Sequence, residues 1–271
     1  MQAPPPAFDP RDRRAADRRI REPEYGVDRR GSGPRAELRF LATRATAALV
    51  SQIAETNLNL TDAATPWYTT TYCDTADHVL YREAEAGGGS LLRLREYHVR
   101  RPESALTSQR IWIEWKDEER DRSQKQRVII RPSDVGPFLR GEPLETGDLL
   151  VALRSRSFFE RGPRPVVITQ CRRVAYATRR DEVRITLDHD LTYYVPETSS
   201  DGEPAPCELG PIVARETGVL IELKWQTDVP DWTAMLLRTL RQEASDRPSK
   251  FVVAMRHLAA NPALLSGGRA S

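Results

Sequence analysis

Val219-Leu-Ile-Glu-Leu-Lys-Trp225 is the stretch that decides the fold of this chain. Side chains along a β-strand alternate between its two faces. Glu222 and Lys224 therefore share one face, while the apolar residues on either side of them share the other. The segment predicts a strand with one charged face and one strongly apolar face.

The same alternation recurs along the chain and predicts about eight strands, mostly joined as antiparallel hairpins. These strands are expected at Arg35–Leu41, Trp67–Cys73, Leu91–Tyr97, Ile111–Lys116, Lys125–Ile130, Pro165–Thr178, Arg184–Asp188 and Val219–Trp225, with Tyr81–Glu83 as a short partner strand. Pro196–Pro206 is polar and rich in proline, so it is expected to be a loop.

Helices are expected between these strands and at the end of the chain. Apolar residues recur at helical spacing over Thr43–Glu55 and again from Asp231 to Leu240. A last helix is expected over Phe251–Leu258. A helical passage from Ser133 to about Phe159 is expected to be interrupted near residues 141–147 and to include the apolar cluster of residues 148–153.

Composition limits the classes of protein that the chain can represent. Its 271 residues include 41 Lys plus Arg and 39 Asp plus Glu, a formal net charge of +2, which argues against a general nucleic-acid-binding surface. The three cysteines lack the spacing of a disulfide framework or a zinc site. No run is long and apolar enough for a transmembrane segment, and the start of the chain has no signal-peptide core. We expect a cytoplasmic protein.

Three regions are expected along the chain. Residues 1–34 are rich in Pro, Arg and Asp and have hardly any large apolar residues, which predicts a disordered tail. A basic arm for a polyanion or a membrane surface is the alternative. Residues 35–260 form the folded domain, and residues 261–271 form a frayed tail.

The charged faces of the strands carry mainly basic residues. They are Arg39, Arg93, Arg95, Lys116, Lys125, Arg127, Arg173, Arg184 and Lys224. Solvent-facing strands are the commonest explanation of such alternation, but a random solvent face on a chain of balanced charge would carry acids about as often. A closed, eight-stranded antiparallel barrel of the α+β class, with helices packed outside, would instead turn these cations inward. Buried cations need a bound polyanion, and phosphate chains fit Arg and Lys best.

Acidic residues are few on the same faces. Glu37, Glu114, Asp188 and Glu222 could hold a hard divalent cation that bridges phosphate oxygens.

With these residues in place, the chain resembles the triphosphate tunnel metalloenzymes and, within them, the VTC-type polyphosphate polymerase domain. No single segment is specific, but their order and number are. The matching segments are Arg35–Phe40, Tyr72–Thr75, Leu92–Tyr97, Ile113–Lys116, Arg173–Tyr176, Arg184–Asp188, Leu220–Lys224 and Ser249–Phe251.

The resemblance implies an antiparallel tunnel barrel that binds ATP, inorganic polyphosphate and Mn²⁺ or Mg²⁺, and that lengthens polyphosphate with release of ADP. It implies phosphate-contacting roles for the nine basic residues above and for Lys250, which matches the Lys of the family's closing Ser-Lys motif. It assigns the catalytic role to Arg93, Arg95, Lys116, Arg184 and Glu222. Glu222 matches the metal-coordinating acid, and Glu37, Glu114 and Lys224 are supplementary ligands or internal ion-pair partners.

Three alternatives remain open from the sequence. The first is a hydrolase of tripolyphosphate or a nucleoside triphosphate in the same tunnel. The second is a polyphosphate-binding module without catalysis. The third is an ordinary β-sandwich whose charged faces are solvated.

Overall fold

A computed structural model describes residues 36–61, 63–64, 66–119, 122–142, 156–180, 182–198, 204–226 and 230–264. The predicted N-terminal tail, the expected helix over residues 148–153 and the last residues of the predicted C-terminal tail lie outside these ranges. Within them, no helix is both long enough and apolar enough to span a membrane.

The described strands form one sheet in which every pairing is antiparallel. Its main path runs β11-β1-β10-β8-β7-β3-β4-β5-β6, with β2 paired to β7 and β9 paired to β8. The strands are β1 (Ala36–Ala42), β2 (Asn59–Thr61), β3 (Trp67–Asp74), β4 (Gly89–His98), β5 (Ile111–Glu119), β6 (Arg122–Ile130), β7 (Arg164–Ala177), β8 (Val183–Thr198), β9 (Pro204–Arg215), β10 (Val219–Trp225) and β11 (Ser245–Asp246).

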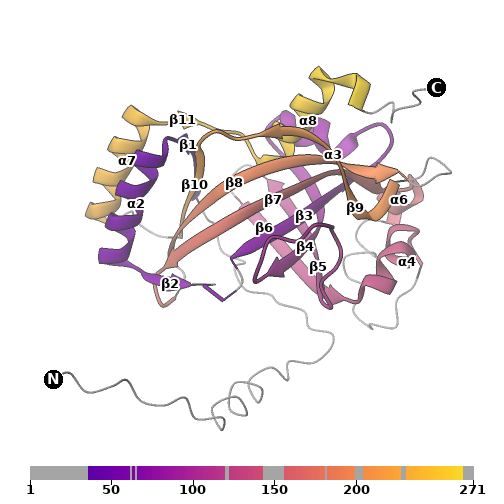
Figure 1. The fold of residues 1–271 in the computed structure, drawn as a ribbon, viewed down its shortest axis with the longest axis horizontal. Helices are drawn as coiled ribbons and strands as arrows, with labels where there is room; N and C mark the ends of the chain where they lie inside the picture. Colours follow the sequence, from indigo (N-terminus) through magenta and orange to yellow (C-terminus); the bar gives the residue numbers. More distant parts are fainter. Residues whose placement is uncertain are drawn as a thin grey trace, which may run out of the picture.

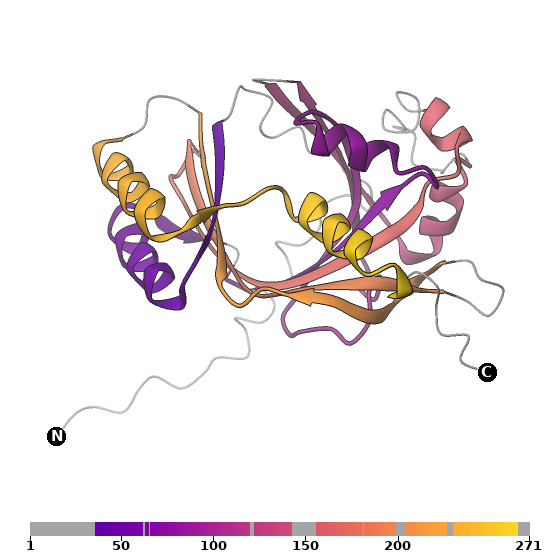
Figure 2. The ribbon, with the colours of Figure 1, turned by 90° about the horizontal axis from the view of Figure 1, so that it is seen from above.

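The expectation of a closed, eight-stranded barrel is corrected by this topology. The described sheet has eleven strands and is open, because β1 pairs with β10 and β11 while β6 pairs with β5. Figure 2 shows the sheet curving from β1 and β10 round to the wall made by β4, β5 and β6. The mostly antiparallel, α+β class that the sequence predicted is confirmed, and the curved sheet still surrounds a central space.

Two helices cover the outer face of β1, β10 and β8 (Figure 1). They are α2 (Arg44–Asn57) and α7 (Asp231–Glu243). Thr43 begins α2, where its hydroxyl accepts a hydrogen bond from the backbone N–H of Thr46 at 3.1 Å. Ile221 and Leu223 are fully buried in this layer, as the alternation in β10 predicts.

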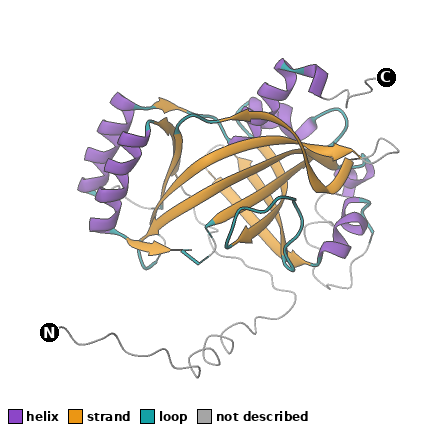
Figure 3. Ribbon diagram, viewed as in Figure 1, coloured by secondary structure: helices purple, strands orange, loops and turns teal. Residues whose placement is uncertain are grey.

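A second core lies toward the other end of the sheet (Figure 3). It is covered by α3 (Val79–Glu85), α4 (Val135–Leu139), α6 (Arg156–Glu160) and α8 (Lys250–Ala260), with two short 3₁₀ turns at Pro132–Asp134 and Pro262–Leu264. In this core Phe251 of α8 stacks on Tyr72 of β3 with ring centroids 5.2 Å apart. Helix α8 is therefore fixed against the inside of the curve.

Two expectations from the sequence are wrong. Tyr81–Glu83 belongs to helix α3, because the buried carboxylate of Asp74 accepts the backbone N–H groups of Leu80 at 3.0 Å and Tyr81 at 2.9 Å, which starts a helix there. The supposed loop over Pro196–Pro206 contains the end of β8 and the start of β9. These two strands pair with three register shifts, and that irregularity hid the alternation in the sequence.

Candidate functional site

A cavity of about 750 Å³ lies in the space that the sheet encloses. Among the described residues, ten basic side chains line it against two acidic ones, Glu37 and Glu222. The basic residues are Arg39, Arg93, Arg95, Lys116, Arg127, Arg173, Arg179, Arg184, Lys224 and Lys250. They come from β1, β4, β5, β6, β7, β8, β10 and α8 and from the β7–β8 turn, so distant parts of the chain converge on one space.

Nine of the ten residues predicted to bind phosphate line this cavity. The exception is Lys125, whose side chain lies outside the described part of the chain. Arg93, Arg95 and Tyr97 all line it, as the alternation in β4 predicts. The charged face of the strands therefore faces the interior space rather than the outer surface.

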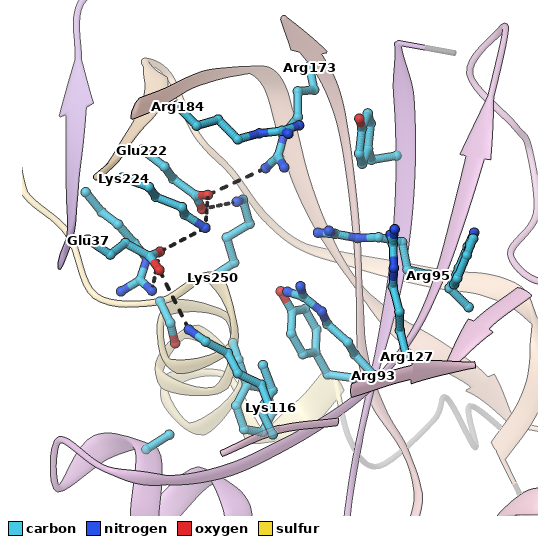
Figure 4. Close-up of a pocket in the computed structure, with 18 of the residues that line it drawn as sticks. Glu37, Arg93, Arg95, Lys116, Arg127, Arg173, Arg184, Glu222, Lys224 and Lys250 are labelled. Carbon is cyan, nitrogen blue, oxygen red and sulfur yellow. Dashed lines mark hydrogen bonds and ion pairs between the residues drawn. The ribbon is translucent and has the colours of Figure 1, made fainter. Parts of the chain in front are cut away.

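Glu222 is the centre of one wall of the cavity (Figure 4). Its carboxylate lies 2.6 Å from the Lys250 ammonium, 3.4 Å from Lys224 Nζ and 3.8 Å from the Arg173 guanidinium. Burial alone would raise the pKa of Glu222, but these cations outweigh it and hold the pKa well below its ordinary value. Glu222 is therefore an ionised carboxylate as long as these three neighbouring cations are charged.

Glu37 is the second acidic residue of the cavity and shares Lys224 with Glu222. It accepts ion pairs from Arg39 at 2.5 Å, Lys224 at 3.4 Å and Lys116 at 3.7 Å. Burial opposes ionisation here too, yet the neighbouring cations, Lys224 foremost, lower the pKa of Glu37 to about 2. Glu37 is on β1 and Lys116 on β5, two strands that do not pair with each other, so this contact joins distant strands of the sheet at the cavity.

Asp188 does not line the cavity, although the sequence suggested it as a cation ligand. It is fully buried behind the wall and accepts two hydrogen bonds from Arg173, at 2.5 and 2.6 Å, and an ion pair from Lys250 at 2.7 Å. Burial would raise the pKa of Asp188, but Arg173 and Lys250 lower it to about 2. Asp188 therefore orients two cations of the cavity without facing it.

The facing wall consists of arginines (Figure 4). Arg93 donates to Glu114 at 2.7 Å through Nε and lies 2.6 Å from it through Nη2, while Arg95 is 3.8 Å away from the same carboxylate. Glu114 is 1% exposed and is not one of the lining residues. In this structure the Glu114 carboxylate holds Arg93 in place from behind the cavity surface.

Aromatic rings support several of these cations. The Tyr68 ring contacts both Arg173 and Arg95, whose guanidinium carbons are 4.9 and 5.5 Å from its centroid. Arg127 lies over Trp112 at 4.3 Å. These rings line the cavity as well, and the sequence pattern did not single them out because core packing explains aromatic residues equally well.

Arg179 is a lining residue that the sequence analysis missed. It lies in the turn between β7 and β8 beside Arg180, which is not among the lining residues. A turn has no two-residue periodicity, so the sequence cannot tell which member of such a pair points inward. The only indication in the sequence was that Arg179 lies in the turn of a predicted hairpin.

The wall of the cavity that carries Glu37 and Glu222, here called the acidic wall, fits a divalent metal ion. Lys224 Nζ is 3.4 Å from an oxygen of both Glu37 and Glu222, so the two carboxylates already converge on one position that holds a positive charge. Mg²⁺ is commonly bound by one or two carboxylates together with substrate phosphates and water. No group of three or more His, Cys, Asp or Glu residues suited to a metal occurs among the described residues, so phosphate oxygens would have to complete such a site.

Comparison with known proteins identifies the family. The VTC domain model matches residues 34–259. Among solved structures, a candidate adenylate cyclase from Bacillus halodurans has a TM-score of 0.51 at 14% sequence identity, covering 80% of this chain and 95% of that chain. A candidate adenylate cyclase from Vibrio parahaemolyticus has a TM-score of 0.43 at 15% identity, with 83% and 99% covered. A search of curated proteins returns no significant match.

The likeness to the Bacillus halodurans protein concerns the fold alone. The family match spans most of the described structure, including every residue that lines the cavity. The chain belongs to the VTC domain family.

Proposed function

We propose that this protein is a metal-dependent polyphosphate polymerase that transfers the γ-phosphate of ATP to a growing polyphosphate chain and releases ADP. The observation that carries the proposal is the cavity itself, in which ten basic side chains face two acidic ones. Such an excess of partly buried cations is costly unless a polyanion neutralises them. Membership of the VTC domain family supports the same conclusion.

In the proposed reaction a terminal oxygen of polyphosphate attacks the γ-phosphorus of ATP. A new P–O bond forms as the bond from the γ-phosphorus to the β,γ-bridging oxygen breaks, and the electron pair leaves with ADP. Phosphoryl transfer of this kind needs little covalent chemistry from the protein, so alignment and charge stabilisation supply most of the catalysis. A cavity lined by fixed cations is suited to both.

The two walls have different roles in this proposal. Arg93, held by Glu114, and Arg95, packed on Tyr68, present forked donors that suit phosphate oxygens. Lys116 and Arg184 stabilise negative charge on the transferred group from their own strands. The remaining basic residues bind the phosphates on either side of the reacting pair; they are Arg39, Lys125, Arg127, Arg173, Arg179, Lys224 and Lys250.

Glu222 and Glu37 would hold the divalent ion, Mn²⁺ or Mg²⁺. An ion held there would neutralise negative charge on the bound phosphates. Lys224 and Lys250 already contact Glu222 at 3.4 and 2.6 Å, so these ammonium groups keep the carboxylate ionised and oriented.

The test is incubation of the purified protein with ATP and Mn²⁺ or Mg²⁺, followed by separate measurement of polymer, ADP and free phosphate. We expect long polyphosphate and ADP in equal phosphate equivalents, and no polymer with Glu222→Ala. Free phosphate without polymer would refute the proposal in favour of a hydrolase that cuts tripolyphosphate or a nucleoside triphosphate. Tight polyphosphate binding without any turnover would instead identify a binding module.

A further inference from the structure

A cluster of three side chains outside the cavity ties the start of helix α8 to the sheet. Glu216, just after β9, accepts a hydrogen bond from the Tyr193 hydroxyl of β8 at 3.0 Å and an ion pair from the Arg247 guanidinium at 2.6 Å. Tyr193 is 1% exposed and the Glu216 side chain 8% exposed. None of the three lines the cavity, so phosphate binding does not explain why a buried acid is held here.

Arg247 connects this cluster to the cavity through the backbone. Its own N–H donates to the carbonyl of Arg39 at 2.9 Å, and it precedes Lys250 by three residues. Ser249 lies between them and caps α8 by accepting the N–H of Val252 at 3.3 Å. Arg247 therefore attaches the segment that leads into α8 to β1.

Lys250 stands in an unfavourable place for a cation, because it is the first residue of α8. The N-terminal end of a helix carries positive partial charge, which repels an ammonium group. Asp188 and Glu222 compensate by contacting Lys250 Nζ at 2.7 and 2.6 Å. Both contacts are short, so a small displacement of the helix start would weaken them.

We propose that Glu216 is a positioning residue that, by binding Arg247 and Tyr193, fixes the start of α8 and so sets where Lys250 stands in the cavity. Tyr193 strengthens this connection because its ring also packs near His257 of α8, with centroids 6.2 Å apart. The inference concerns anion binding in the cavity and rests on the proposed function only to that extent.

The sign of the effect separates positioning from simple electrostatics. Removing the negative charge of Glu216 makes the surroundings of the cavity more positive, so charge alone predicts tighter binding of a polyanion. Positioning predicts weaker binding. Glu216→Ala and Glu216→Gln lose the same charge, but glutamine keeps an oxygen that can accept hydrogen bonds from Arg247 and Tyr193.

The experiment measures the Kd for tripolyphosphate by calorimetry, together with unfolding in urea, for the full chain. We expect Glu216→Ala to weaken binding about fivefold, as is usual for coupled contacts, and Glu216→Gln to stay close to wild type. In a Lys250→Ala background the Glu216→Ala change should have no further effect. The matched control is Glu55→Ala, which also removes a Tyr–Glu hydrogen bond, that from Tyr176 at 2.8 Å, and should leave Kd unchanged.

Three results would overturn the inference: unchanged or tighter binding by Glu216→Ala, equal Kd values for the Ala and Gln variants, or a full additional loss in the Lys250→Ala background. If Glu216→Ala does not fold, Tyr193→Phe removes one hydrogen bond without a charge change and must weaken binding in the same Lys250-dependent way. Polymer synthesis by the wild type is scored separately. Its failure would refute the proposed function while the binding cycle still decides the role of Glu216.

Discussion

Replacing Asp188 by Asn tests the electrostatic design of the cavity wall most directly. The carboxylate is fully buried, accepts two hydrogen bonds from Arg173 at 2.5 and 2.6 Å and contacts Lys250 at 2.7 Å. Asparagine has nearly the same shape but no charge, so two buried cations would be left with less compensation. Removing one partner of a buried ion pair costs about 3–5 kcal/mol. Since the amide oxygen can still accept a hydrogen bond, we expect a loss near the lower end, about 3 kcal/mol.

Urea unfolding of the ligand-free protein measures this loss as a change in the free energy of unfolding. Asp190→Asn is the matched control, because Asp190 lies two residues along the same strand with its side chain 46% exposed and 3.9 Å from both Arg44 and Arg172. Its φ of 54° is a conformation that asparagine also tolerates. An exposed pair at that distance contributes less than about 1 kcal/mol. Equal losses from the two variants, or a loss below about 1 kcal/mol for Asp188→Asn, would contradict the reasoning.

Three further predictions follow from the site. The pKa values of Asp188 and Glu37 are lowered from 3.8 and 4.5 to about 2, so their stabilising contribution is complete above the unfolded values and is lost as the pH falls toward 2. For Asp188 this loss of stability amounts to roughly 2 kcal/mol and can be measured by urea unfolding at a series of pH values. A free energy of unfolding that does not change over this pH range would contradict the prediction. Arg179→Ala should weaken the binding of long-chain polyphosphate about threefold in a calorimetric titration. Arg180→Ala is the control, because Arg180 does not line the cavity, and it should leave binding unchanged. Equal effects of the two variants would exclude a specific role for Arg179 in binding. Chelation of divalent cations should stop polymer formation by the wild type, and polymer that persists after chelation would remove the metal-binding role of Glu222.

The regular strands were predictable from the sequence because alternation is a local property. Val219–Trp225 has the predicted bounds as β10, and its charged face lines the cavity as expected. The same reasoning succeeded for Arg93 and Arg95, which lie on a regular part of β4. Local periodicity was therefore enough to find most cations of the site.

Features that depend on long-range contacts were not predictable in this way. Closure of the barrel depends on whether two edge strands meet, and alternation within each strand carries no information about that. The role of Asp188 was missed because its partners Arg173 and Lys250 are 15 and 62 residues away along the chain, and only the fold brings them to one carboxylate. Pattern alone could identify the charges of the site but not their partners.

The open side of the curved sheet has a mechanical consequence. The 3.7 Å ion pair between Glu37 and Lys116 joins β1 to β5, which do not pair as strands, whereas neighbouring strands of the sheet are joined by backbone hydrogen bonds. We expect an entering polyanion to compete with Glu37 for the Lys116 ammonium group, which would weaken this ion pair while the backbone hydrogen bonds between strands stay intact. Binding of a phosphate chain would thus replace an ion pair between two strands with contacts between the strands and the ligand.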